Sequence, residues 1–162
     1  MLKHASTFDH SADDLIKLLC GEAFNVEAQG ARPDVVSVDY KLLKDGDMME
    51  FVVPYRHYKR TRTFKLDKKV IEDSRSEYKM NMRTKELVWK HVGAEEAGKI
   101  RIEGVTRFVP LGPSRTRLER DVTIEIKIPI VGRGIAKYIE GEFRKAYDEV
   151  EHHINESIGR LL

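Results

Sequence analysis

Hydrophobic and polar residues alternate along a predicted strand in the last third of the chain, from Leu118 to Ile130. Val122, Ile124 and Ile126 alternate there with charged or hydroxyl-bearing residues. Successive side chains of a strand point to opposite faces, so a period of two predicts one buried face and one face in water. A Gly-Arg-Gly sequence follows the strand, and we expect its glycines to meet the special backbone angles of a strand-to-helix joint rather than to hold a phosphate.

A single long amphipathic helix is predicted from Ile135 to Leu162. Its apolar residues recur three and four positions apart and form one stripe, which includes Ile139, Phe143 and Tyr147. At 1.5 Å per residue the helix would be about 40 Å long. A helix of this length has to lie across the rest of a small protein.

The first part of the chain predicts one strand and two short helices. The strand covers Leu2–Phe8, and its side chains at His4 and Ser6 share a face with Leu2. Ser11 is expected to cap the first helix, and residues 22–28 form the second.

After Pro33 the pattern has the period of strands. A turn at Asp45-Gly46 has the composition of a β-hairpin, and the charged stretch Arg56–Arg62 is interpreted as a solvated hairpin. Strands are predicted at residues 36–42, 49–55, 63–70, 78–82 and 100–108. Because such a sheet twists and curls, the chain predicts an α+β fold: a curved antiparallel sheet of about seven strands wrapped around the C-terminal helix, in a single domain spanning residues 1–162.

Large side chains gather on the predicted inner faces of this sheet. They either pack as a solid core or line a pocket, and the composition favours neither. The residues concerned on the strands are Tyr40, Phe51, Tyr55, Phe64, Tyr78, Met80, Met82, Trp89 and Phe108.

The order of elements resembles the START-like superfamily, also called SRPBCC or helix-grip proteins. The most similar segment begins at Thr116 and reads TRLERDVTIEIKIPIVGRGIAKYIEGEFRKAYDEV, in which Pro129 to Gly132 form a Pro-apolar-apolar-Gly sequence. The opening FDHSADDLIKLL is also similar to the family's first strand and helix. The first of these segments resembles an uncharacterised bacterial branch of the superfamily.

This resemblance implies a hydrophobic cavity under the long helix. Relatives use such a cavity to bind or carry lipids, sterols or polyketides, or to cyclise and dehydrate polyketide intermediates. We therefore interpret the strand residues above, together with Ile139, Phe143 and Tyr147, as ligand-binding, and keep a cyclase or dehydratase as the alternative. The resemblance assigns no catalytic residue.

Charge and composition narrow the choice of partners. The chain has 162 residues, with 29 Lys and Arg against 27 Asp and Glu, and this balance argues against an obligate nucleic-acid partner. The densest positive charge lies in Arg56–Arg62, so a transient contact with an anionic membrane through Arg56, Lys59, Arg60 and Arg62 is a further hypothesis.

Few residues indicate metal or redox chemistry. Cys20 is the single cysteine and lies on an apolar helix, so we expect a buried, inert thiol. Six histidines show no metal-binding spacing, and we expect neither a metal nor another cofactor. The sequence lacks the pattern of a secretory leader or a membrane span, which makes a cytoplasmic location the default expectation.

Overall fold

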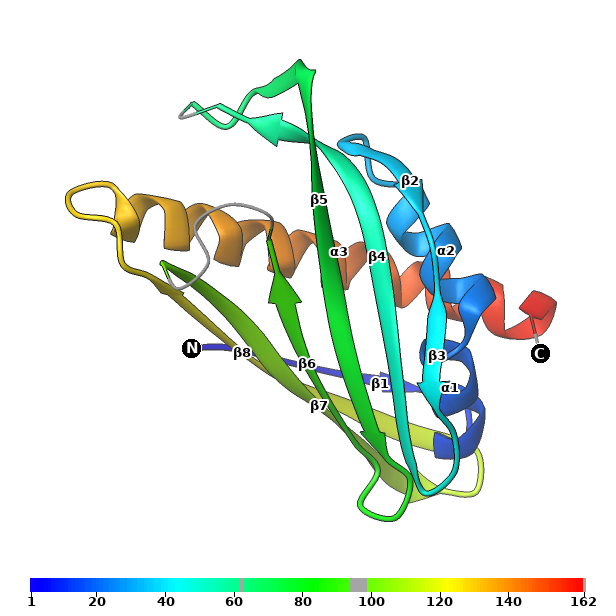
Figure 1. Cartoon of the computed structure of the whole chain (residues 1–162). Coiled ribbons are helices and arrows are strands. Elements are labelled where there is room, and N and C mark those ends of the chain that lie inside the picture. Colours follow the sequence, from blue (N-terminus) through cyan, green and yellow to red (C-terminus); the bar gives the residue numbers. More distant parts are fainter. Residues whose placement is uncertain (62, 94–98, 162) are drawn as a thin grey trace.

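The computed structural model describes residues 1–61, 63–93 and 99–161 of the chain, and Figure 1 shows them as one curved sheet with three helices. The elements follow in the order β1 (Leu2–Phe8), α1 (Ala12–Leu19), α2 (Glu22–Gly30), β2 (Val35–Val38), β3 (Lys41–Lys44), β4 (Met48–Arg60), β5 (Leu66–Asn81), β6 (Glu86–Val92), β7 (Ile100–Gly112), β8 (Arg115–Ile126) and α3 (Gly132–Leu161).

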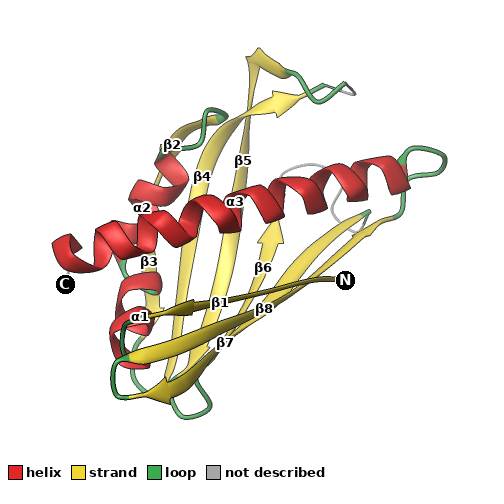
Figure 2. Ribbon diagram, turned by 180° about the vertical axis from the view of Figure 1, so that it is seen from behind, coloured by secondary structure: helices red, strands yellow, loops and turns green. Residues whose placement is uncertain are grey.

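All strand pairs are antiparallel, and the strand order is β1-β8-β7-β6-β5-β4-β2, with β3 also paired to β4. The predicted curved antiparallel sheet and long C-terminal helix are confirmed. Figure 2 shows α3 lying across the concave side of the sheet, with α1 and α2 beside its C-terminal half.

Several predicted strand boundaries are wrong. The strand expected over 36–42 is two short strands, because the chain breaks at Asp39 and Tyr40 between β2 and β3. Residues 66–70 and 78–81 of two strands expected separately belong to one 16-residue strand, β5. The stretch from Arg56 to Arg60 pairs with β5 as the end of β4. The strand β6 is an additional strand that the sequence pattern did not predict. Phe64 lies in the turn between β4 and β5 at a φ of 62°, so it is not a strand residue.

The joint between β8 and α3 also differs from expectation. The strand ends at Ile126 and the helix begins at Gly132, so residues 127–131 form a loop. The left-handed backbone in this loop is at Ile130, with a φ of 71°, and not at a glycine. Gly132 is needed for a different reason, since a Cβ there would lie 2.8 Å from the carbonyl oxygen of Ile126.

The helix α1 is capped as its sequence predicts. The Ser11 hydroxyl accepts a hydrogen bond from the amide of Asp14 at 3.1 Å, which satisfies one free donor of the first turn. Its apolar face, which includes Leu15 and Ile16, packs into the same core cluster as Ile154 of α3. Burying an aliphatic side chain of this size stabilises the fold by roughly 1.5–3 kcal/mol.

The helix α3 does not cover the sheet evenly. Its closest backbone neighbours are β8 and β1 at one edge and α1 and α2 near its C-terminal end. Over β4 to β6 its backbone stays further away, and large side chains bridge the distance. This uneven cover places the aromatic residues of the central strands opposite the middle of α3.

Candidate functional site

One row of side chains on the inner face of the sheet is dominated by aromatic rings. Strand register places Phe51, Tyr78, Trp89 and Gly104 side by side on β4, β5, β6 and β7. Phe51 stacks on Tyr78 with 4.6 Å between ring centroids and 6° between the ring planes, and Tyr40 stacks on the other side of Phe51 at 5.3 Å. Tyr40, Phe51 and Tyr78 thus form a stack of three rings in the interior, with Phe51 fully buried in the middle.

The middle of α3 adds two rings to this surface. Phe143 lies 5.7 Å from Trp89, and Tyr147 lies 5.9 Å from Phe143, measured between ring centroids. Part of the surface stays accessible on each of four residues, Tyr78, Trp89, Phe143 and Tyr147. Burial nevertheless raises the pKa of Tyr78 and Tyr147 to about 12. These four side chains are therefore packed closely by their neighbours, yet none of them is fully buried.

A polar group lies one step further along the same inner face. The Tyr55 hydroxyl is 3.2 Å from Nδ1 of His91, and Nε2 of His57 is 2.7 Å from the Ser74 hydroxyl. Burial lowers the pKa of His91 from 6.5 to about 4, with smaller contributions from the positive charge of Arg32 and from His57. His91 is therefore a neutral imidazole at pH 7.

The Tyr55 ring is held from the helical side of the molecule. The Arg32 guanidinium lies 5.4 Å from the ring centroid, and its Nη2 donates to the buried Asp34 carboxylate at 2.8 Å. Burial raises the pKa of Tyr55, and the charge and hydrogen bond of Arg32 oppose that rise. The hydroxyl therefore stays protonated at neutral pH and is able to donate a hydrogen bond.

A second polar group lies toward the β1 edge. Arg120 on β8 is buried and donates from Nη1 to Nδ1 of His4 at 3.3 Å and to the Ser6 hydroxyl at 3.2 Å. Its guanidinium carbon lies 4.6 Å from the centroid of the Tyr147 ring. This group joins the sheet edge to the middle of α3.

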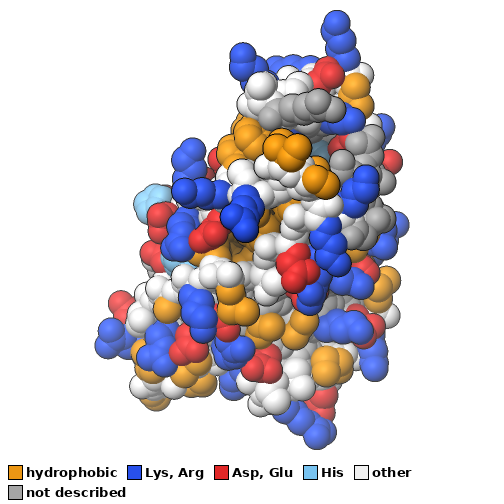
Figure 3. Space-filling view, turned by 90° about the vertical axis from the view of Figure 1, so that its left-hand side faces the viewer, with side chains coloured by type: hydrophobic (Ala, Val, Ile, Leu, Met, Phe, Trp, Pro, Cys, Tyr) orange, Lys and Arg blue, Asp and Glu red, His pale blue; other side chains and the backbone are white. Residues whose placement is uncertain are grey.

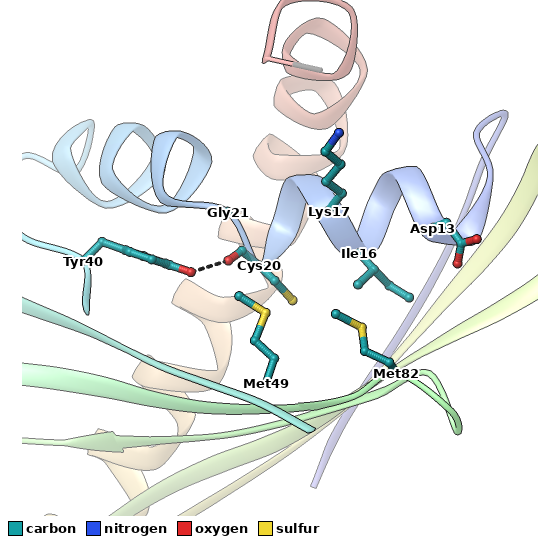
Figure 4. A pocket seen from close by; sticks show the side chains of 8 residues that line it. All are labelled: Asp13, Ile16, Lys17, Cys20, Gly21, Tyr40, Met49 and Met82. Atoms are coloured by element: carbon teal, nitrogen blue, oxygen red, sulfur yellow. Dashed lines mark hydrogen bonds between the residues drawn. The ribbon is translucent and has the colours of Figure 1, made fainter. Parts of the chain in front are cut away.

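Two hollows open at the ends of the interior. One, of about 390 Å³, lies between α1 and the sheet, where Met49, Met82 and Ile16 point toward one another (Figure 4). The Tyr40 hydroxyl donates to the carbonyl oxygen of Cys20 at its back, at 2.7 Å. The other hollow, of about 270 Å³, lies at the opposite end of the sheet, where charged residues such as Lys90, Arg101 and Glu125 line most of it and His91 and Ile102 also line it.

The predicted site residues occupy different surroundings. Phe51, Met80 and Phe108 are buried in the core cluster, whereas Tyr40 and Met82 line the larger hollow. Ile139 lies half-buried on α3. Phe64 stacks on Tyr138 at 4.0 Å, at the far end of α3. The ring and polar contacts described above involve Tyr55, Tyr78, Trp89, Phe143 and Tyr147. That all the predicted site residues bind a ligand stays a prediction.

The four cations predicted for membrane contact are not equivalent. Arg56 pairs with Asp73 at 3.4 Å and Lys59 with Glu72 at 3.8 Å. Arg60 donates to the carbonyl oxygen of Phe64 at 2.8 Å, and Arg62 lies outside the described residues.

Sequence reasoning missed Arg120 and His91 as interior residues. The signal was present for Arg120, because it continues the even-numbered series of Val122 and Ile124 along β8. His4 was placed on the right face of β1, but its partner could not be named without the register of β1 against β8.

Comparison with known proteins assigns the family. Residues 57–158 match the family model described as Protein of unknown function (DUF2505). The chain belongs to this family. The DUF2505 protein matches no curated protein significantly.

Solved structures share the fold of this DUF2505 protein. The Zhui aromatase/cyclase from Streptomyces sp. R1128 has a TM-score of 0.61 and 15% identity, covering 98% of this chain and 93% of that chain. A START superfamily protein from Mycobacterium smegmatis has a TM-score of 0.55 and 13% identity, covering 99% and 98%. Norcoclaurine synthase from Thalictrum flavum has a TM-score of 0.60 and 11% identity, covering 96% and 86%. The predicted START-like, helix-grip fold is thereby confirmed.

Among the helices that the structure describes, none combines the length and apolar character needed to cross a bilayer. Within the same described residues, no three His, Cys, Asp or Glu side chains converge as metal ligands would.

Proposed function

We propose that this DUF2505 protein binds a small, elongated hydrophobic ligand between the inner face of the sheet and α3. The observation that carries the proposal is the set of partly accessible aromatic rings, Tyr78, Trp89, Phe143 and Tyr147, at the centre of the fold. Flat rings give a ligand a large contact area at little cost in side-chain entropy. Each ligand methylene buried there contributes about 0.8 kcal/mol.

Binding is tested by titrating delipidated protein with a panel of fatty acids, sterols and aromatic polyketides. Trp89 is the single tryptophan of the chain, so its fluorescence reports directly on occupancy. We expect Phe143→Ala to weaken binding about tenfold, because it removes one wall of the site, whereas Val88→Ala on the exposed outer face of β6 leaves binding unchanged. Absence of binding across the panel, together with no small molecule co-purifying by native mass spectrometry, would refute the proposal.

An enzyme of the cyclase or dehydratase kind is the second candidate, favoured by the pair of Tyr55 and His91. A protonated phenol and a neutral imidazole, 3.2 Å apart, supply a proton donor and a proton acceptor in one desolvated place. Cyclisation and dehydration of a poly-β-carbonyl chain need both.

The enzyme hypothesis is checked by incubating the protein with a linear poly-β-carbonyl analogue and following products by mass spectrometry. We expect Tyr55→Phe and His91→Gln to abolish product formation while ligand binding persists. If the unsubstituted protein binds the analogue but releases it unchanged, the protein is a carrier and not an enzyme of this kind.

A transient contact with an anionic membrane through Arg56, Lys59, Arg60 and Arg62 stays a prediction, and we propose the β8–α3 loop as a further membrane contact. Ile130 is fully exposed at a left-handed φ that β-branched residues rarely adopt, and Val131 beside it is half exposed. Lys127, Arg133 and Lys137 flank them in the sequence, and none has a carboxylate within 4 Å among the described residues. Figure 3 views this end of the molecule and shows hydrophobic side chains among those of Lys and Arg.

An exposed apolar loop flanked by unpaired cations is suited to the interface of a bilayer. Each cation near an anionic membrane surface contributes about 1 kcal/mol to the free energy of membrane binding. We expect the protein to sediment with vesicles containing phosphatidylserine but not with phosphatidylcholine vesicles. Ile130→Ser should weaken this association, while Val88→Ser, at an exposed apolar position away from the loop, should not. Equal sedimentation of both variants would exclude the loop as the contact.

A further inference from the structure

Arg120 is a buried cation on the inner face of the sheet. Only 5% of the residue is exposed. Strand register places it between His4 of β1 and Thr106 of β7, both on the same face. Its side chain therefore points from β8 toward α3, where it meets the Tyr147 ring.

The guanidinium is only partly satisfied by its neighbours. Nη1 donates to His4 and Ser6, but Nε and Nη2 donate to none of the residues that the structure describes. No carboxylate of the described residues lies within 4 Å of it, although the more distant Glu151 contributes a favourable electrostatic interaction. Burying a guanidinium without a direct counter-ion is unfavourable, and the contact with the Tyr147 ring offsets only part of that cost.

The surroundings of the guanidinium indicate what is missing. Tyr147 donates its hydroxyl to no described residue, so the ring that the Arg120 guanidinium contacts carries a second unused donor. The aromatic row of Trp89 and Gly104 is the neighbouring row of the same face, one step along the strands. A ligand that lies along this row would bring one of its ends to Arg120.

We propose that Arg120, with the Tyr147 hydroxyl beside it, binds the carboxylate head of an amphipathic ligand whose apolar tail lies along the aromatic row. This inference rests on the proposed ligand-binding function and names the class of ligand. The free Nε and Nη2 are the two neighbouring donors with which a guanidinium binds both oxygens of a carboxylate.

The charges nearby favour a head with a single negative charge. Nε2 of His4 lies 3.8 Å from Asp148 and 3.7 Å from Glu151, so two carboxylates already stand on the α3 side of this group. The positive charge of Arg120 balances the single negative charge of a ligand carboxylate. The second negative charge of a phosphate monoester would instead be repelled by Asp148 and Glu151. A fatty acid or another monocarboxylate therefore fits better than a phosphorylated lipid.

The test compares three ligands with the same C12 chain: dodecanoate, dodecanol and dodecyl phosphate, each titrated at pH 7 against the delipidated protein by Trp89 fluorescence. A hydrogen-bonded charge pair of this kind gives a preference of about tenfold to a hundredfold. We expect the protein to bind dodecanoate tighter than dodecanol by this factor, and tighter than dodecyl phosphate.

Two variants separate a ligand role from a structural one. Arg120→Met keeps an unbranched apolar chain in place of the arginine stem and removes the guanidinium, so it should bind dodecanol as before and lose the preference for dodecanoate. Arg117→Met is the matched control, because Arg117 lies on the outer face of the same strand and pairs with Glu119 at 2.8 Å. It should keep the preference.

The outcomes distinguish this inference from the function on which it rests. Equal affinity of the unsubstituted protein for dodecanoate and dodecanol overturns the role of Arg120 but leaves hydrophobic binding intact. A preference for dodecyl phosphate, or a preference for dodecanoate that survives in Arg120→Met, overturns it as well. Failure of all three ligands to bind the unsubstituted protein refutes both proposals, and this comparison needs no variant to fold.

Discussion

Replacing Gly104 with alanine tests the packing on which the candidate site depends. Gly104 faces Trp89 across β6 and β7, and a Cβ added at this glycine would lie 2.7 Å from two carbons of the indole ring. The same Cβ would lie 2.8 Å from the carbonyl oxygen of Asp121 on β8. Ring and backbone both have to move, and the indole ring already contacts Phe143, with 5.7 Å between ring centroids.

Overpacking of this kind costs typically about 1–3 kcal/mol. For a protein of this size each kilocalorie lowers Tm by roughly 2–4 °C, so we expect Gly104→Ala to lower Tm by about 2–12 °C. Because Trp89 is the reporter as well as the displaced group, its emission should shift in the folded variant.

Gly134→Ala is the matched control for this substitution. Gly134 lies in the first turn of α3, where an added Cβ meets nothing within 4 Å. Alanine is a better helix former than glycine by up to about 1 kcal/mol, so the control should be as stable as the original protein or slightly more stable. A Gly104→Ala protein with unchanged Tm and unchanged emission would refute the close approach of the indole ring to β7.

Three other predictions concern single groups. Burial lowers the pKa of His91 to about 4 in the folded protein, so the unfolded chain binds a proton first as the pH drops below about 6.5. The free energy of unfolding should therefore fall by roughly 2–3 kcal/mol between pH 6.5 and 4. In urea unfolding, His91→Gln should show a flatter dependence of this free energy on pH. Burial raises the pKa of the Cys20 thiol to about 12, so the thiol should not react with Ellman's reagent until urea unfolds the protein. Rapid reaction in the folded protein would contradict this burial and show that the helix α1 opens readily. Ser11→Ala removes the hydrogen bond to the amide of Asp14 and should cost about 1 kcal/mol in chemical denaturation, with a stability equal to the original protein arguing against this cap.

The amino-acid sequence by itself determined the class of fold. The period of two along β8 and the period of three to four along α3 are local properties of the chain, and both appear in the structure. The cap at Ser11 and the burial of Cys20 were also readable, because each depends on a few neighbouring residues.

Only the tertiary structure decided which side chains meet. Periodicity places Arg120 on the inner face, but the register of β1 against β8 brings His4 to it and the position of α3 brings Tyr147. The pairing of Tyr55 with His91 likewise joins residues that are 36 positions apart. Strand register and helix placement are set by the packing of the whole chain, and no local pattern carries them.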